Sequence, residues 1–237
     1  MIEVDFHTHT LMSTCGLHSA LEMISAAKKK GLKGIAITDH GPLLGGKTPS
    51  TFYDRFENTV EGIHVLKGAE LNLVPEGNDA DIDPRFIPYC DILILGLHES
   101  VSGGKSREYY TERLLGAIRA NSYIDGITHP NSYAYPVNYR ALAEGARELG
   151  VALEFNNSKV RYSRVAEKET VDLIRACRDT GCPVMVNTDS HTVNELGDVS
   201  HIERLIRAEG FDEGQIVNRT LETALAWLDS RKQYKQV

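Results

Sequence analysis

Short apolar runs alternate with longer amphipathic segments along this chain, and this alternation constrains its fold more than any other feature. The runs are rich in Ile, Val and Leu and lack apolar–polar alternation, which is typical of strands buried on both faces. Segments with apolar residues at helical intervals lie between several of these runs. One such segment follows Ser19, where Ser19 and Glu22 form a capping-box signature. The expected strands are residues 2–6, 34–38, 65–69, 92–97, 126–128, 151–155 and 184–188.

A strand followed by a helix, repeated about seven times, predicts a parallel sheet covered by helices. The number of units favours closure into a barrel, although an open doubly wound sheet would give much the same pattern. No Pro- or Ser-rich linker and no compositional break interrupts residues 1–237. We therefore expect one α/β domain over the whole chain.

Charge and terminal sequence narrow the choice of partners. The formal net charge of −7 argues against nucleic acid or an anionic membrane, but a small anionic substrate remains compatible because bound cations reverse the local potential. The first residues lack a basic region followed by an apolar stretch, and no window approaches the roughly 18 apolar residues of a membrane span. The four cysteines form no CxxC pair. We expect a cytoplasmic protein with reduced thiols, and the oligomeric state is left open.

Histidines gather where the expected strands end. In a (β/α) barrel the carboxyl ends of all strands meet at one face, so residues that follow different strands become neighbours. A single histidine at a strand end is more often a hydrogen-bonded loop residue, but six of the nine histidines lie at such positions. They are His7 and His9 after the first strand, His40 after the second, His98 after the fourth, His129 after the fifth and His191 after the seventh.

Acidic residues accompany these histidines at the same ends. Glu70 ends the third strand, Glu154 lies in the sixth, and Asp189 follows the seventh. The two imidazoles of the His7–His9 pair should point to one side of an extended segment. Imidazole together with carboxylate suits Zn²⁺, Mn²⁺ or Fe, so the pattern predicts a metal centre.

Seven short motifs occur in order over most of the chain. They are HTHT (7–10), ITDH (37–40), GAE (68–70), GLHE (96–99), THP (128–130), EFNNS (154–158) and TDSH (188–191). Together they resemble the PHP (polymerase and histidinol phosphatase) family, above all its stand-alone bacterial phosphatases. The resemblance implies a distorted seven-stranded (β/α)7 TIM-like barrel with two or three divalent metal ions, usually zinc, with manganese or iron as alternatives. The ligands that it implies are His7, His9, His40, Glu70, His98, His129, Asp189 and His191.

Cys15 departs from the family pattern. Relatives carry His or Asp eight residues after the first motif histidine, where this chain has Cys15. A thiolate is a good zinc ligand, so Cys15 can take this place and is included among the expected ligands. The alternatives are a weaker metal position or transfer of the role to His18.

The resemblance also implies the reaction, hydrolysis of a small phosphate monoester by a metal-activated water at a multinuclear site. Asp189 and His191 are the expected catalytic residues. Arg161 and Arg164 follow the sixth strand and are the expected phosphate anchors, because a guanidinium can grip phosphate with two donors. The opposing interpretation is that they are solvated surface arginines.

Three other functions compete with this one. A phosphodiesterase or exonuclease is one alternative, because relatives fused to DNA polymerases carry similar sites. A non-catalytic metal-binding domain is another, and only Cys15 favours it. The third is a nucleotide-binding loop, because GPLLGGKT (41–48) matches GxxxxGK[ST]. Pro49 removes a backbone donor at the point where the helix should begin, so we interpret this match as coincidence.

Overall fold

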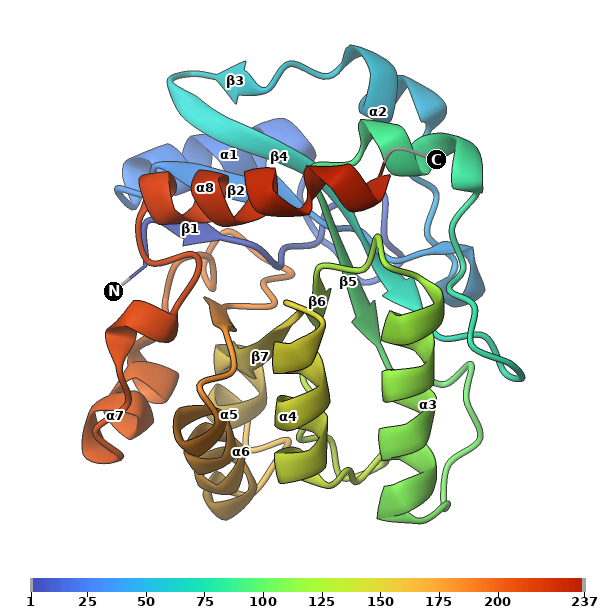
Figure 1. Ribbon diagram of the computed structural model, residues 1–237. Helices are drawn as coiled ribbons and strands as arrows, with labels where there is room; N and C mark the ends of the chain where they lie inside the picture. The colour runs from blue at the N-terminus through green and yellow to red at the C-terminus, as the bar shows by residue number, and fades with distance from the viewer. Residues whose placement is uncertain (1, 236–237) are drawn as a thin grey trace.

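The computed structural model describes residues 2–235 and contains a nearly closed barrel of parallel strands (Figure 1). Neighbouring strands in the barrel follow the order of the chain. The parallel strands are β1 (Val4–Asp5), β2 (Gly34–Ile37), β4 (Ile63–Asn72), β5 (Ile92–Gly96), β6 (Gly126–Ile127), β7 (Ala152–Asn156) and β8 (Val184–Asn187), and β3 (Thr59–Val60) pairs antiparallel with β4. All seven expected runs form strands, so the predicted seven-stranded barrel is confirmed.

Helices connect the strands and surround the barrel. They are α1 (Ala20–Lys29), α2 (Ser50–Arg55), α3 (Arg107–Ala120), α4 (Tyr139–Glu148), α5 (Asn157–Arg161), α6 (Glu167–Thr180), α7 (Ser200–Ala208) and α8 (Leu221–Arg231). The shorter 3₁₀ turns are η1 (Pro42–Leu44), η2 (Pro84–Tyr89), η3 (Glu213–Gln215) and η4 (Lys232–Lys235). The capping box expected at Ser19 and Glu22 is present at the start of α1. Within residues 2–235, no helix has the length and apolar character needed to cross a membrane.

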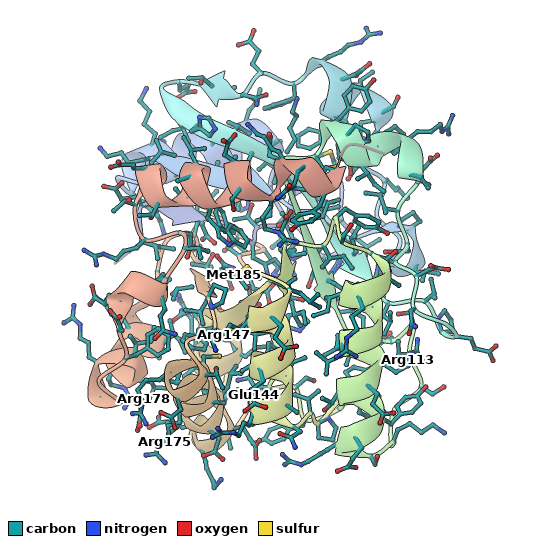
Figure 2. The ribbon with its side chains drawn as sticks, in the orientation of Figure 1. Arg113, Glu144, Arg147, Arg175, Arg178 and Met185 are labelled. Carbon is teal, nitrogen blue, oxygen red and sulfur yellow. The ribbon has the colours of Figure 1, made fainter. Side chains whose placement is uncertain are left out.

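Each central strand contributes to two apolar layers, which explains why the sequence shows no polar alternation. Ile92 and Ile94 of β5 belong to the cluster inside the barrel, whereas Leu93 and Leu95 belong to the cluster under the outer helices. Met185 fills the interior beside Gly126, where a Cβ atom would lie 2.6 Å from the Met185 Cε atom (Figure 2). Both faces of the strand are therefore buried, as the run of apolar residues predicts.

The last helix covers one end of the barrel. Ala224 and Leu228 of α8 pack into the inner cluster. Arg231 at the end of α8 is buried and pairs with Asp125, which precedes β6, through Nε and Oδ1 at 2.9 Å. Lys235 adds a second contact to Asp125, with 2.7 Å between Nζ and Oδ2. Apolar packing and a buried ion cluster thus hold α8 in place.

Side chains complete the closure between β8 and β1. At the carboxyl end, Thr8 and Ser190 form an isolated parallel bridge. Further down, the buried Asn218 side chain lies between the strands. Its Nδ2 lies 2.8 Å from the carbonyl oxygens of both Val4 and Val186, and its Oδ1 accepts from the Val186 N–H at 3.0 Å. Asn218 therefore satisfies backbone groups that an unbroken ladder would pair.

Candidate metal centre

The inward-facing positions of the strands change from apolar to polar toward their carboxyl ends. On β4, Leu66 packs inside the barrel, and Gly68 and Glu70 follow at intervals of two residues. On β8, the inner residue Met185 is followed four residues later by Asp189. Because side chains of a strand alternate between its faces, this spacing aims Glu70 and Asp189 into the mouth of the barrel.

His7 and His9 lie side by side in this mouth, as expected from their spacing. Their Nε2 atoms are 3.1 Å apart, and both side chains are fully buried. The Nε2 atoms lie 3.2 and 3.4 Å from Glu70 Oε2, and 3.5 and 3.3 Å from Asp189 Oδ1. Two imidazoles and two carboxylates from three strands therefore face one small space.

Glu70 is the centre of a second group of imidazoles. Its Oε2 lies 2.9 Å from His40 Nδ1, and its Oε1 lies 3.2 Å from His98 Nε2 and 2.9 Å from His129 Nε2. His191 lies on the other side of the mouth, with its ring centroid 4.5 Å from that of His9. The structure thus brings together all eight ligands implied by the resemblance.

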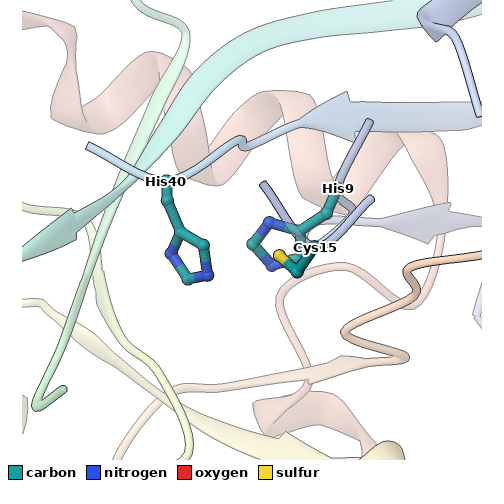
Figure 3. Close-up of side chains that lie close together, drawn as sticks. All are labelled: His9, Cys15 and His40. Carbon is teal, nitrogen blue, oxygen red and sulfur yellow. The ribbon is translucent and has the colours of Figure 1, made fainter. Parts of the chain in front are cut away.

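Cys15 joins this cluster from the loop before α1. Figure 3 shows its sulfur beside the His9 ring, with His40 turned toward the same space. The ligand atoms of His9, Cys15 and His40 lie within 4.8 Å of one another, and two further groups meet the same limit: His7, His9 and Asp189, and His40, Glu70 and His98. Among the described residues, Cys15 belongs to one of these groups and His18 to none.

Buried neighbours fix the orientation of the imidazoles. Glu154 Oε1 lies 2.8 Å from His7 Nδ1, which leaves His7 Nε2 facing the mouth. His9 Nδ1 lies 3.3 Å from Ser13 Oγ, and that hydroxyl donates to Asp39 at 2.6 Å. Such carboxylate–histidine contacts are typical of metal-binding histidines, because they set the tautomer and aim the other ring nitrogen at the ion. The role of Glu154 emerges only from the structure.

The carboxylates and burial shift the pKa values of the mouth histidines in opposite directions, and burial lowers the pKa values of His9 and His129 to about 4. Burial lowers the pKa of His7, but the charges of Glu70 and Glu154 outweigh it and hold that pKa well above its usual value. Burial likewise opposes the effect of Glu70 on His40, whose pKa rises to about 10. Burial raises the pKa of Asp189, but His7 and Lys159 reverse this and hold the carboxylate ionised. Buried carboxylates in this number require nearby positive charge.

The residues present fit a divalent transition metal. Glu70 Oε2 is buried, yet none of the described residues donates a hydrogen bond to it, and the same holds for both ring nitrogens of His98. Buried polar atoms without partners are rare and call for an explanation. Nitrogen, carboxylate and thiol donors together form a ligand set for Zn²⁺, Fe or Mn²⁺.

The positive side chains that follow β7 differ in what they contact. The Nζ atom of Lys159, on α5, lies 3.5 Å from Asp189 Oδ2, and no motif in the sequence singles this residue out. Arg161 pairs with Asp198 at 2.9 Å and lies against the Tyr162 ring. Arg164 is exposed, lies against the same ring, and forms no ion pair with any residue from 2 to 235. Of these three cations, Lys159 contacts the cluster directly.

The GPLLGGKT loop does not have the geometry of a nucleotide-binding loop. Its backbone donors are used within the protein: Gly41 N donates to Glu70 O, Leu43 N to Asp81 Oδ2, and Lys47 N to Met12 O. The helix that follows, α2, begins only after Pro49 and has 6 residues. Backbone N–H groups that are already paired cannot cradle a phosphate. The structure agrees with the interpretation of this motif match as a coincidence.

Comparison with known proteins adds independent information. The family described as PHP domain matches residues 5–155. A protein named "probable phosphatase" from Shewanella sediminis is 34% identical over 235 residues, which cover 96% of this chain and 94% of that protein. A second "probable phosphatase", from Shewanella pealeana, is also 34% identical, covering 96% and 93%.

Solved structures share the fold at lower sequence identity. A histidinol phosphate phosphatase from Lactococcus lactis, complexed with zinc, L-histidinol and phosphate, aligns with a TM-score of 0.64 and 19% identity over 88% of this chain and 94% of that chain. Metal-dependent tyrosine phosphatases from Bacillus subtilis and Streptococcus pneumoniae align with a TM-score of 0.57 and 16% identity, covering 90% and 89%. At these identities the likeness concerns the barrel itself.

Proposed function

We propose that this chain, which belongs to the PHP domain family, is a metal-dependent phosphatase that hydrolyses a small phosphate monoester. The observation that supports the proposal most is Glu70, a buried carboxylate whose Oε2 faces ring nitrogens but accepts no hydrogen bond of regular geometry from residues 2–235. Five imidazole nitrogens from four strand ends lie within 3.4 Å of its two oxygens, those of His7, His9, His40, His98 and His129. A carboxylate that faces ring nitrogens on both oxygens is suited to bridge metal ions.

Two or three divalent ions, with zinc as the first choice, would be held by nine residues. These are His7, His9, Cys15, His40, Glu70, His98, His129, Asp189 and His191. When bound, such ions supply positive charge that stabilises phosphoryl oxygens and lowers the pKa of a water molecule.

The side chains around this centre would orient the water, complete the ligand set and bind the phosphate. Asp189 faces His7 and His9 with Oδ1, a position from which its carboxylate would orient the attacking water and accept its proton. His191 donates from Nδ1 to the Asp189 carbonyl at 2.9 Å, so its Nε2 remains free for the centre. Lys159 beside Asp189 would attract the substrate phosphate, and Arg164 and Arg161, which both lie against the Tyr162 ring, are the further candidate anchors.

A monoester is favoured over a nucleic-acid diester by charge and by relatives. The net charge of −7 disfavours a polyanionic partner, and relatives that cover nearly all of the chain are named phosphatases. We further propose that residues 1–237 act as one domain in the cytoplasm.

Metal content and turnover of two variants test the proposal. Asp189→Asn keeps the shape of the side chain but removes its charge, so phosphate-monoester turnover should fall by about 10²- to 10⁴-fold. The matched control is His201→Ala, because His201 is exposed on α7. It should change neither turnover nor metal stoichiometry. Turnover of Asp189→Asn at the wild-type level would overturn the assignment, as would an active wild-type enzyme without a bound transition metal.

A further inference from the structure

We propose that Cys15 makes one position of the metal centre selective for thiophilic ions such as Zn²⁺ or Co²⁺ and unfavourable for Mn²⁺ and Mg²⁺. This inference rests on the proposed function, because it concerns the same centre. It goes further by assigning different ion preferences to positions within that centre.

The geometry brings one sulfur and two imidazoles together at the outer side of the cluster. The Cys15 sulfur and one ring nitrogen each of His9 and His40 lie within 4.8 Å of one another (Figure 3). The Cys15 side chain is partly exposed, whereas His9 is fully buried. The thiol therefore closes the ligand set from the solvent side.

The backbone holds Cys15 in this position. Its loop is tied down by Leu11 N donating to His18 O at 2.8 Å and by Leu17 N donating to His191 O at 3.0 Å. Gly16, the next residue, lies so close to the preceding turn that a Cβ atom would lie 2.0 Å from Thr10 O. A loop fixed in this way presents the sulfur at a defined place, which metal ligation requires.

A second feature of the same space also points to a cation. Glu70 Oε2 is 2.9 Å from His40 Nδ1, is buried, and lacks a hydrogen bond from any residue between 2 and 235. His40 belongs to the sulfur-containing group and to the group with Glu70 and His98. The thiol thus lies beside a buried carboxylate oxygen that could accept a cation.

Ligand chemistry then separates the positions. The groups formed by His7, His9 and Asp189 and by His40, Glu70 and His98 offer nitrogen and oxygen only, which also suit Mn²⁺. Thiolate sulfur prefers zinc, iron and cobalt, whereas Mn²⁺ and Mg²⁺ prefer oxygen. One ion position should therefore exclude manganese while the others accept it.

Cobalt loading provides a direct spectroscopic test. The purified protein is exchanged into Co²⁺, and wild type should show a sulfur-to-cobalt charge-transfer band in the near ultraviolet besides the weaker visible bands of cobalt. Cys15→Ser should lose the charge-transfer band and retain visible bands from the histidine- and carboxylate-bound ions. The control is Cys90→Ala, which should keep the charge-transfer band because Cys90 is buried beside the Phe86 carbonyl and outside the three groups.

Metal competition supplies a second readout that does not depend on activity. With Mn²⁺ alone, wild type should bind one ion fewer per chain than with Zn²⁺, and Cys15→Asp should remove this difference. Visible cobalt bands without a charge-transfer band in wild type, or equal Zn²⁺ and Mn²⁺ stoichiometry, would overturn the inference and leave the proposed function standing. Failure to take up any cobalt would overturn both.

Discussion

Two residues of the metal centre adopt a backbone conformation that residues other than glycine rarely adopt. His129 has φ of 29° and Asp189 has φ of 52°. Each lies just beyond the end of a strand, where the left-handed turn keeps the side chain aimed into the mouth of the barrel. A conformation of this kind costs about 1–3 kcal/mol and persists only where the surroundings enforce it. Its occurrence at two members of one cluster agrees with a functional role for that cluster.

Glu154→Gln tests whether the carboxylate behind His7 tunes the metal centre. Glutamine keeps the shape but removes the charge that faces His7 Nδ1 at 2.8 Å. Metal affinity should fall by about 10- to 100-fold, measured by competition with a chromophoric chelator. Glu148→Gln on the exposed surface of α4 is the control and should leave affinity unchanged. Equal affinities for both variants would show that Glu154 serves the fold alone.

Gly96→Ala tests the space beneath His98. A Cβ atom at Gly96 would lie 2.3 Å from His98 Cε1 and 2.7 Å from Thr128 Oγ1, so His98 must move. We expect a loss of bound metal and a destabilisation of about 1–3 kcal/mol, measured by metal analysis and denaturant unfolding. Gly103→Ala is the control because nothing lies within 4 Å of its added Cβ. Full metal content in Gly96→Ala would argue against His98 as a ligand.

At the level of elements, the inward-facing side of a strand carries apolar residues first and site residues beyond its carboxyl end. Ile92 and Ile94 on β5 pack inside the barrel, and the same alternation continues through Gly96 to His98. β1 ends at Asp5, and His7 and His9 follow it in an extended segment outside any ladder. The closure between β8 and β1 consequently combines one backbone bridge, between Thr8 and Ser190, with the side chain of Asn218.

Asn218→Ala should weaken this closure. The change removes the partner of the Val4 and Val186 carbonyls and of the Val186 N–H, all in a buried place. Unpaired buried groups cost about 1–3 kcal/mol each, so we expect a loss of roughly 3 kcal/mol in the free energy of unfolding, measured in urea. Asn194→Ala, at an exposed position, should be neutral. A loss no larger than that of Asn194→Ala would mean that water can replace the Asn218 side chain.

Lys47→Ala tests the GPLLGGKT loop. Lys47 is exposed, and its N–H already donates to Met12 O at 2.8 Å. The variant should keep its fold and metal content and lose little phosphatase rate. Calorimetry should detect no ATP binding in wild type or variant. ATP binding that disappears in Lys47→Ala would instead revive a nucleotide-binding role.

Across the whole molecule, the two ends of the barrel are stabilised by different means. The end where the strands begin is closed by α8 with Ala224 and Leu228, and its charges are paired internally through Asp125 and Arg231. At the opposite end, the buried carboxylates Glu70 and Asp189 pair with imidazoles and with Lys159 among residues 2–235. The barrel should therefore depend on bound metal for stability at one end only.

Metal removal should lower the melting temperature. An ion present at about 1,000 times its dissociation constant stabilises a folded protein by about 4 kcal/mol. For a chain of this size we expect chelation to lower the melting temperature by about 10 °C, measured by calorimetry. Added Zn²⁺ should restore the original value. A melting temperature that chelation does not change would contradict a metal centre that links the strand ends.

The sequence by itself determined which segments form the strands and which residues lie at the carboxyl ends of those strands. Strands buried on both faces need continuous apolar runs, and parallel strands place their carboxyl ends together, so the seven strands and the convergence of residues such as His40 and Asp189 followed from pattern alone. Comparison with the family motifs also identified Cys15, which stands where relatives carry His or Asp. These features are local in the chain or follow from topology.

Other features depended on contacts between distant residues, and only the tertiary structure decided them. Glu154 supports His7 across 147 positions, and Asn218 joins β1 to β8 without any motif. The short helix α5 turns Lys159 toward Asp189, whereas Arg161 turns to Asp198. Hydrogen bonds and ion pairs act over a few ångströms and need defined angles, so which polar atoms meet is settled only when the packed backbone fixes their positions.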